Sequence, residues 1–370
     1  MKEITIIGGG LAGLISSILL QRKGYEVNLY EKKQFPFHRV CGEYVSDEVR
    51  PFLERNSLFP DASHPSRIRT FEFSSVKGRR FELPLDLGGF GVSRYVLDEF
   101  LYQIALKEGV NVVTKQAITD VRFIGDKFLV KTGSESFESK IVIGAYGKKS
   151  VIDNKLDRGF THKRAPFIGV KYHIKTDYPK DKVALHNFQS GYCGISAIED
   201  DKYNLCYLGS REMLKKHGSI EAMENMVVKQ NPFLKEIFNN SEFIFDKPEV
   251  INEFSFSPKS AVESHILMTG DTAGLITPLC GNGMAMAIHS GKIVSESVST
   301  HYTKGQLNRQ ALEEDYIRTW NRTFKKRLRV GRRTQALFGS SFTSEVAVSL
   351  MRNSSFFAYQ IMKNTHGQPF

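Results

Sequence analysis

The sequence has few cysteines, one tryptophan and no long hydrophobic run. The four cysteines are far apart and form no C-x-x-C pair: Cys41, Cys193, Cys206 and Cys280. This spacing argues against a zinc site and a disulfide framework, and it indicates a cytoplasmic protein. The longest apolar runs, such as residues 15–20, fall far short of the roughly 20 residues that span a bilayer. The first residues also lack the charged and apolar regions of a signal peptide.

Recognisable catalytic clusters are missing as well. No Ser-His-Asp arrangement and no metal-ligand cluster can be read from the spacing, so we expect no metal. His38, His186 and His289 are each interpreted as surface or structural histidines rather than bases.

Positive charge is in excess, and part of it lies in one segment. The net charge is +11, and residues 301–340 hold ten Lys/Arg against three acids. Apolar residues recur there every four positions, which predicts one amphipathic basic helix: Leu312, Tyr316, Trp320, Phe324 and Leu328. Its charged face is either solvated or docks an anionic lipid surface, an acidic carrier protein or a diphosphate. Nucleic acid is not expected, because no binding module is recognisable.

A glycine motif follows the first predicted strand. Residues 4–7 predict a buried strand, and Gly8, Gly10 and Gly13 complete G-x-G-x-x-G directly after it. In this motif the glycines allow a tight turn, a close approach to a pyrophosphate and close packing of helix on strand. The second strand ends at Glu31, about where an acid binds ribose hydroxyls. This context predicts a dinucleotide site; the alternative is a glycine-rich turn without a ligand.

A second glycine-rich stretch, GDTAGLITPLCGNGM, occupies positions 270–284 and leads into a predicted helix, Met284–Val298. It follows a predicted buried strand, so Asp271 would lie in the crevice where open α/β sheets bind ligands and could hold the sugar-alcohol chain of a flavin. Bare amides at the helix start would face the pyrimidine edge, where reduced flavin is negative and the helix dipole stabilises it. The alternative is an elaborate loop at a domain seam.

A third segment links these two. Residues 93–113 predict a helix with Ser93 as its N-cap, followed by a parallel strand. Arg94, in the first turn, is either a positive partner of the pyrophosphate or a surface arginine.

These stretches resemble a known superfamily. GGGLAG with Glu31, VSRYVLDEFL, IVIGAYGKKSVI and GDTAGLITPLCGNGM are similar to FAD-dependent oxidoreductases built like para-hydroxybenzoate hydroxylase. HRVCGEYVSDEV is most similar to the geranylgeranyl reductase family, and the resemblance covers about residues 1–300. It implies a Rossmann-like FAD-binding domain of the GR2 type.

The resemblance also implies roles for single residues. It places these residues on the adenosine diphosphate half of FAD and its pyrophosphate: Gly8, Gly10, Gly13, Glu31 and Arg94. It places these on the ribityl chain and the isoalloxazine ring: Gly270, Asp271, Pro278, Gly281, Asn282, Gly283 and Met284. Cys41 and Glu43 would lie near the flavin and face the substrate cavity.

The sequence departs from these families at three places. The superfamily has Asp-Gly where this chain has Tyr146-Gly147, after Ala145, so the acid is missing. Its absence argues against hydroxylation gated by NADPH. The Tyr-x-Trp-x-Phe-Pro pattern of the reductases is absent, and GYCGISAIED stands near its place. The Trp-x-Trp-x-Ile-Pro signature of the flavin halogenases is missing too, since Trp320 is the only tryptophan.

The middle of the chain predicts strands in a mainly antiparallel sheet: TFEFSS, RRFELPL, FIGVKYHI, KVALHNF, GYCGISAI and KYNLCYLG. The alternating residues 168–174 and 203–207 give this sheet an apolar, aromatic face, which either roofs a cavity over the flavin or is plain core. The predicted fold is α/β: an FAD-binding domain (1–65, 90–160, 262–300) interleaved with a substrate-binding β-sheet domain (66–89, 161–261), then C-terminal helices (301–370).

Cys41 and Glu43 are the candidate catalytic residues. Cys41 is either a small buried hydrophobic residue or a reactive group. In the second case the neighbouring cations of its loop activate it, and with Glu43 it delivers a proton to a substrate carbon. The leading hypothesis is an FAD-dependent oxidoreductase that reduces a C=C bond of an apolar prenyl, polyene or polyketide-type substrate, lipid- or carrier-bound. The alternatives are an FAD monooxygenase and a non-catalytic flavin-binding electron carrier or sensor. The expected reductant is NAD(P)H or a protein donor that binds transiently, since no second G-x-G-x-x-G is present. The expected location is the cytoplasm, with the inner face of the membrane as a peripheral alternative.

Overall fold

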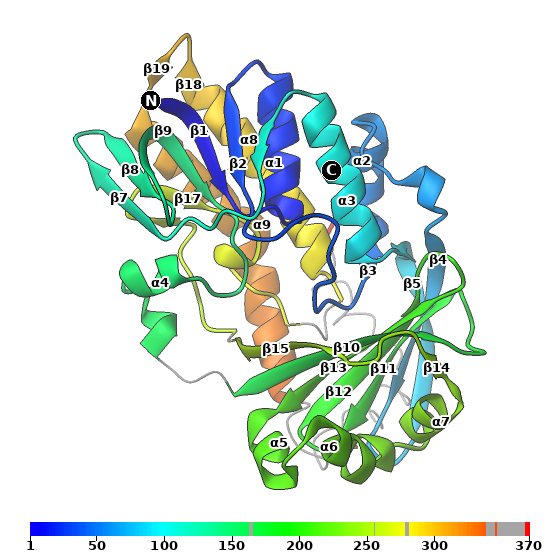
Figure 1. Cartoon of the computed structure of the whole chain (residues 1–370). Helices are drawn as coiled ribbons and strands as arrows, with labels where there is room; N and C mark the ends of the chain where they lie inside the picture. The colour runs from blue at the N-terminus through cyan, green and yellow to red at the C-terminus, as the bar shows by residue number, and fades with distance from the viewer. Residues whose placement is uncertain (163–165, 255, 278–280, 338–344, 346–366) are drawn as a thin grey trace.

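The computed structural model arranges the chain around two β-sheets, one above the other in Figure 1. It describes residues 1–162, 166–254, 256–277, 281–337, 345 and 367–370. Both sheets draw strands from segments that are far apart in the sequence.

The first sheet has eight strands, six of them on the path β16-β17-β9-β1-β2-β6. Its strands are β1 (Lys2–Ile7), β2 (Val27–Tyr30), β6 (Asn111–Val113), β7 (Asp120–Ile124), β8 (Lys127–Lys131), β9 (Ser136–Gly144), β16 (Val262–Glu263) and β17 (Ile266–Met268). The centre is parallel: β1 pairs with β2 and β9, β2 with β6, and β9 with β17. The predicted Rossmann-like arrangement is therefore present.

Helices of several segments pack on this sheet and on one another: α1 (Leu11–Arg22), α2 (Arg50–Arg55), α3 (Arg94–Lys107), α4 (Val151–Lys155), α8 (Gly283–His301) and α9 (Arg309–Leu337). α1 lies against α3 and α8, and α8 lies against α9. The predicted helices at 93 and at 284 are confirmed, and the Ser93 hydroxyl caps α3 by accepting from the Val96 amide at 3.2 Å.

α9 confirms the predicted amphipathic helix. Its apolar stripe is buried: Leu312, Tyr316, Trp320, Phe324 and Leu328. Several of its cations are exposed: Arg318, Arg322, Lys325, Lys326, Arg329 and Arg333. Arg327 is an exception, with only 8% of its surface exposed.

The second sheet has nine strands, eight of them on the path β14-β10-β13-β12-β11-β4-β5-β3. Its strands are β3 (Tyr44–Ser46), β4 (Ser66–Ser74), β5 (Arg80–Gly91), β10 (Phe167–Lys175), β11 (Lys182–Phe188), β12 (Gly191–Ala197), β13 (Tyr203–Ser210), β14 (Glu242–Phe243) and β15 (Glu249–Phe254). Most pairs are antiparallel, as expected, and β4 and β11 are parallel. β3 comes from the segment 1–65 that was assigned to the FAD-binding domain, yet it pairs with β5 of this sheet.

The two faces of the second sheet have different neighbours. On one face, residues 168–174 and 203–207 pack through alternate side chains against three helices that were not expected from the sequence: α5 (Arg211–His217), α6 (Ile220–Met226) and α7 (Pro232–Asn240). The hypothesis that this aromatic face roofs a cavity over the flavin is wrong, because the helices cover it.

The opposite face is turned toward the first sheet. It carries Lys171 and His173, which contact Glu43, and a separate apolar cluster. That cluster contains Leu275 of the second glycine-rich stretch, together with Phe73, Phe81, Leu185, Tyr192, Leu208 and Phe256. This face, not the predicted one, is the wall nearest to the candidate site.

Candidate functional site

The first glycine turn leaves the start of α1 open. Gly8 has φ +105°, and a Cβ there would lie 2.5 Å from the Ala145 carbonyl oxygen. A Cβ on Gly13 would lie 1.9 Å from the Gly8 oxygen, so helix and strand could not pack. Gly10 is the N-cap of α1, and no side chain caps the helix. A Cβ on Gly10 would meet the Arg94 Nη2 at 3.6 Å, so a guanidinium stands beside the open amides.

Glu31 lies beside this turn, directly after β2, and it is buried. Its carboxylate accepts from the amide of Gly9 at 2.9 Å and the amide of Lys33 at 3.0 Å. The Nη2 of Arg39 donates to it at 3.2 Å and also to the Gly9 carbonyl at 3.2 Å. The acid is therefore held beside the glycine turn, and its contact with a ribose stays a prediction.

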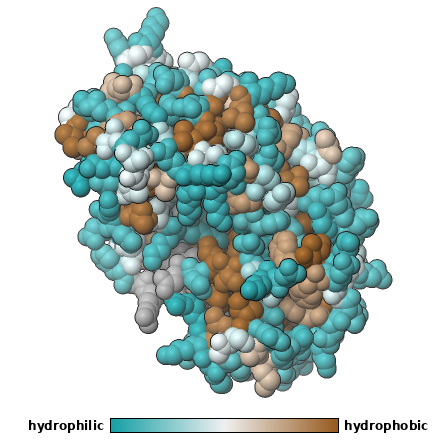
Figure 2. Space-filling view, viewed as in Figure 1, coloured by the Kyte–Doolittle hydropathy of each residue, from teal (hydrophilic) through white to brown (hydrophobic). Residues whose placement is uncertain are grey.

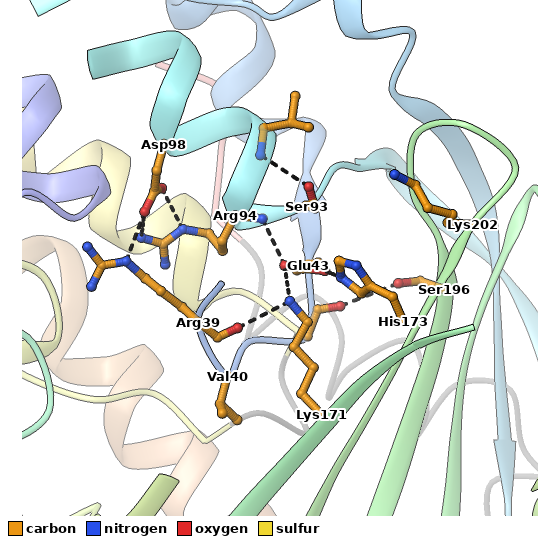
Figure 3. A network of polar contacts seen from close by, with 12 residues as sticks. Arg39, Val40, Glu43, Ser93, Arg94, Asp98, Lys171, His173, Ser196 and Lys202 are labelled. Atoms are coloured by element: carbon orange, nitrogen blue, oxygen red, sulfur yellow. Dashed lines mark hydrogen bonds and ion pairs between the residues drawn. The ribbon is translucent and has the colours of Figure 1, made fainter. Parts of the chain in front are cut away.

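Two arginines share one buried carboxylate next to the turn. Asp98 accepts from Arg94 through Nε and Nη2, both at 2.7 Å, and from Arg39 Nε at 2.9 Å (Figure 3). Burial alone would lower the pKa of Arg94, but Asp98 more than offsets this and raises it. Arg94 is thus held in place beside the open helix start. Arg39 was not among the predicted site residues, because nothing in the local pattern indicates that it reaches Glu31 and Asp98.

The second glycine-rich stretch lies beside the start of α1, since a Cβ on Gly270 would lie 3.0 Å from the Ala12 Cβ. Gly270 has φ +61°, and its amide donates to the Ser290 hydroxyl at 2.8 Å, which ties the short helix η5 (Gly270–Thr272) to α8. Among the described residues, no hydrogen bond or ion pair of the Asp271 carboxylate is found. Lys259 donates to the Asp271 carbonyl at 2.9 Å, and burial lowers the pKa of Lys259 to about 8. Sequence reasoning missed this lysine.

α8 begins without a side-chain cap. Asn282 occupies the N-cap position between Gly281 (φ +61°) and Gly283, and its side chain makes no capping bond to the first turn. Met284 is buried in the first turn. Pro278 and Cys280 lie outside the described residues.

The residues present fit FAD. Both helix starts offer backbone amides that no side chain caps, and Asp271 offers a carboxylate without a protein partner in the part of the chain described. Glu31 and Arg94 stand at the first of these starts, as an adenosine ribose and a pyrophosphate require.

The loop that carries Cys41 is tied to the second sheet. Lys171 and Ser196 of that sheet donate to the Arg39 carbonyl at 3.2 Å and the Gly42 carbonyl at 3.3 Å, and Lys148, which follows β9 of the first sheet, donates to the Val40 carbonyl at 3.4 Å. Figure 3 shows Lys171, His173 and Ser196 converging on this loop from the strands of the sheet. Cys41 itself is half-buried. The loop is therefore fixed at the carbonyls on either side of Cys41.

Glu43 lies in a buried ion network rather than in an open cavity. Its carboxylate accepts from the Arg94 amide at 2.8 Å, from Lys171 at 2.5 Å and from His173 Nε2 at 2.7 Å. Burial would raise the pKa of Glu43, but Lys171 and His173 lower it, so the group is ionised. The predicted catalytic roles of Cys41 and Glu43 stay predictions, and the geometry of Glu43 is that of a residue that fixes a loop.

The three histidines that were set aside pack against other side chains. His38 stacks on Tyr95 at 4.6 Å between ring centroids, and burial lowers its pKa to about 4. His186 is fully buried and shares a hydrogen bond of 2.8 Å with Ser74, and burial lowers its pKa to about 3. His289 stacks on Phe370.

Tyr146 occupies the position of the superfamily acid. Its hydroxyl donates to Asp153 at 3.3 Å, and Asp153 is buried in an ion pair with Arg158 at 2.9 Å. Arg158 also donates to the Thr272 carbonyl at 3.0 Å, which connects this network to η5.

Comparison with known proteins agrees with this geometry. Residues 6–49 match the family model of the NAD(P)-binding Rossmann-like domain. A digeranylgeranylglycerophospholipid reductase of Methanosarcina acetivorans is 26% identical over 340 residues, covering 87% of this chain and 81% of that protein. A geranylgeranyl bacteriochlorophyll reductase-like protein of Thermoplasma acidophilum superposes with a TM-score of 0.78 at 17% identity, covering 100% of this chain and 96% of that one. The chain has the fold of the FAD-dependent oxidoreductases.

Within these FAD-dependent oxidoreductases, halogenases are also similar in fold. The flavin-dependent halogenase CmlS gives a TM-score of 0.74 at 21% identity, and the match covers 88% of this chain and 63% of that chain, so this chain spans less than two thirds of that halogenase. None of the helices in the described part of the chain combines the length and the apolar character that a membrane span requires.

Proposed function

We propose that this FAD-dependent oxidoreductase is a reductase that saturates a carbon–carbon double bond of an apolar prenyl, polyene or polyketide-type substrate. The observation that carries the proposal is the anchored Cys41 loop, which lies between the FAD-binding residues and the inner face of the second sheet. The similarity to a digeranylgeranylglycerophospholipid reductase supports it. Tyr146 replaces the acid of the superfamily, and this supports a reductase over a hydroxylase whose reaction is gated by NADPH.

When bound and reduced, FAD supplies the hydride for one carbon of the double bond, and the neighbouring carbon needs a proton. Glu43 is a poor source for that proton, since its carboxylate is ionised and filled by three donors. Cys41 is half-buried, so its Sγ–H can reach both a substrate and, after the transfer, solvent protons that restore the thiol. Cys41 is therefore the proposed proton donor, and Glu43, with Lys171 and His173, positions its loop.

Apolar surface near this loop fits the proposed substrate class. The inner face of the second sheet carries the cluster around Tyr192, Leu208 and Leu275. Figure 2 shows a hydrophobic patch over the second sheet, and Ile244, which directly follows β14 at the edge of that sheet, exposes 39% of its surface. The proposed reductant is NAD(P)H or a protein donor that binds transiently.

The test is an anaerobic half-reaction. Reduced, FAD-loaded protein is mixed without oxygen with a prenyl substrate that contains isolated double bonds, and flavin absorbance and product mass are followed. We expect reoxidation and a product that has gained two hydrogens and no oxygen. Cys41→Ser should slow reoxidation by about 100-fold or more, the usual contribution of a general acid, while FAD binding changes little. Cys193→Ala, which removes a thiol from the helix-covered face of the second sheet, is the control.

Oxygen chemistry is the second candidate, and the fold similarity to the halogenase CmlS favours keeping it in the test. An oxygen-dependent product that carries one added oxygen atom would replace the reductase proposal by a monooxygenase. If no substrate is turned over and reoxidises the flavin, either with oxygen or without it, the result would favour a non-catalytic electron carrier or sensor.

A further inference from the structure

One arginine of the basic helix α9 points inward. Arg327 is 8% exposed, whereas Arg322, Lys326 and Arg329 of the same helix are exposed. Its Nη2 donates to both carboxylate oxygens of Glu48, at 2.9 and 3.0 Å. Glu48 is fully buried in the short helix η1 (Asp47–Val49), which follows the Cys41 loop and β3.

The same carboxylate reaches the start of α8. Glu48 accepts from the side-chain amide of Asn282 at 2.9 Å and from the backbone amide of Gly367 at 2.5 Å. Asn282 is the N-cap residue of α8, and its side chain is turned to Glu48 instead of capping the first turn. Among the described residues, no side chain therefore caps the first-turn amides of α8.

This arrangement places a pair of opposite charges, Glu48 and Arg327, next to the start of α8. The N-terminus of a helix carries about half a positive charge, which favours an anion placed there. Glu48 is a full negative charge one hydrogen bond away from that turn, in a buried place where solvent screens it poorly. Arg327 is the cation that neutralises it. Removing one member of such a buried pair leaves an uncompensated charge.

We propose that Arg327 and Glu48 are positioning residues that set the reduction potential of the flavin, by keeping the α8 N-terminus electrostatically available to the anionic pyrimidine edge of the reduced ring. The inference rests on the proposed function only in requiring FAD at this site, and it holds for a reductase and a monooxygenase alike. It gives α9 a role in the site that is separate from its exposed basic face.

The two single substitutions have opposite signs. Arg327→Met leaves Glu48 uncompensated, so the reduced anion should bind about tenfold more weakly relative to oxidised flavin, which lowers the two-electron midpoint potential by about 30 mV. Glu48→Gln removes the negative charge that Arg327 binds, so Glu48 no longer balances the positive charge of Arg327 and the potential should rise by a similar amount. A structural disturbance alone would not reverse its sign between the two variants.

The potential is measured by anaerobic dye-coupled reduction of the FAD-loaded protein. The double variant Glu48→Gln/Arg327→Met should return to the wild-type potential, Arg327→Lys should stay close to it, and Arg322→Met on the exposed face of α9 is the matched control. If Arg327→Met does not fold, Glu48→Gln and Arg327→Lys still carry the test. Equal potentials in all variants, or shifts of the same sign in both single variants, would overturn the inference while leaving the proposed function intact. A wild-type protein that binds no FAD would overturn both.

Discussion

Two glycine-rich turns precede α1 and α8, the two helices predicted to bind FAD, and they are held in different ways. The turn before α1 is fixed by its immediate neighbours, since added Cβ atoms on Gly8 and Gly13 would strike backbone at 2.5 and 1.9 Å. The turn before α8 has more room: a Cβ on Gly281 would make only ordinary contact with Tyr44 at 3.4 Å. There the glycine is needed mainly for its φ of +61°.

The second turn depends instead on distant side chains. Asn282 is bound to Glu48, which is 234 residues away in the sequence, and Glu48 is bound to Arg327, which is 279 residues away. The comparison shows that one helix start is fixed by steric fit within a local motif, and the other by an ion network assembled from three parts of the chain.

Substitutions at the glycines of the two turns test this comparison, and they have the largest expected effect. Gly13→Ala should destabilise the protein by about 4 kcal/mol or more and abolish FAD retention, because the clash is with backbone that cannot move away. Gly281→Ala should cost only about 1–2 kcal/mol, the penalty of the left-handed conformation. Thermal unfolding and flavin content report both, with Gly133→Ala, where a Cβ meets nothing within 4 Å, as the control. Equal losses at Gly13 and Gly281 would remove the distinction between the turns.

A smaller effect is expected from the acid at each turn. Glu31→Ala and Asp271→Ala should each weaken FAD binding by about ten- to a hundredfold, since a lost hydrogen bond to a charged group costs roughly 1.5–3 kcal/mol. Glu31→Ala should also lower the stability of the apo-protein, because Arg39 and two amides lose their acceptor; Asp271→Ala should not, since its carboxylate has no partner among the described residues. FAD titration and apo-protein melting separate the two. Glu236→Ala, at an exposed position of α7, is the control, and full FAD retention in both variants would show that the site is misplaced.

The smallest effect on the fold is expected from the exposed face of α9. Reversing Arg322, Lys326 and Arg329 to Glu should change stability by no more than about 0.5 kcal/mol per site and leave the flavin potential unaltered, in contrast to Arg327→Met. If this face docks an anionic lipid surface, the alternative to a solvated face, the wild type should sediment with anionic lipid vesicles, and the variant should not. Salt should weaken the association, because exposed charges are screened beyond about 8 Å at physiological ionic strength.

A second reversed variant controls for net charge. Lys215, Lys216 and Lys235 are exposed on the helices of the second sheet, and their reversal to Glu changes the net charge equally. Vesicle binding that is lost in both variants, or in neither, would make the exposed face of α9 a solvated surface only.

The sequence by itself determined the local elements and the motif that joins them. The β1–α1–β2 unit with Glu31, the Ser93 cap of α3 and the buried stripe of α9 all follow from apolar period, glycine placement and capping chemistry, which act over a few residues. Six of the nine strands of the second sheet, β4, β5 and β10–β13, were predicted for the same reason.

Only the tertiary structure decided which surfaces and charges meet. Period two shows that residues 168–174 have an apolar face, but it does not show that α5–α7 cover that face and that Lys171 and His173 turn toward Glu43. Nor does a run of cations show which one is buried. Arg327 differs from its neighbours on α9 only because the fold brings Glu48 to it, and such long-range pairing leaves no periodic trace in the sequence.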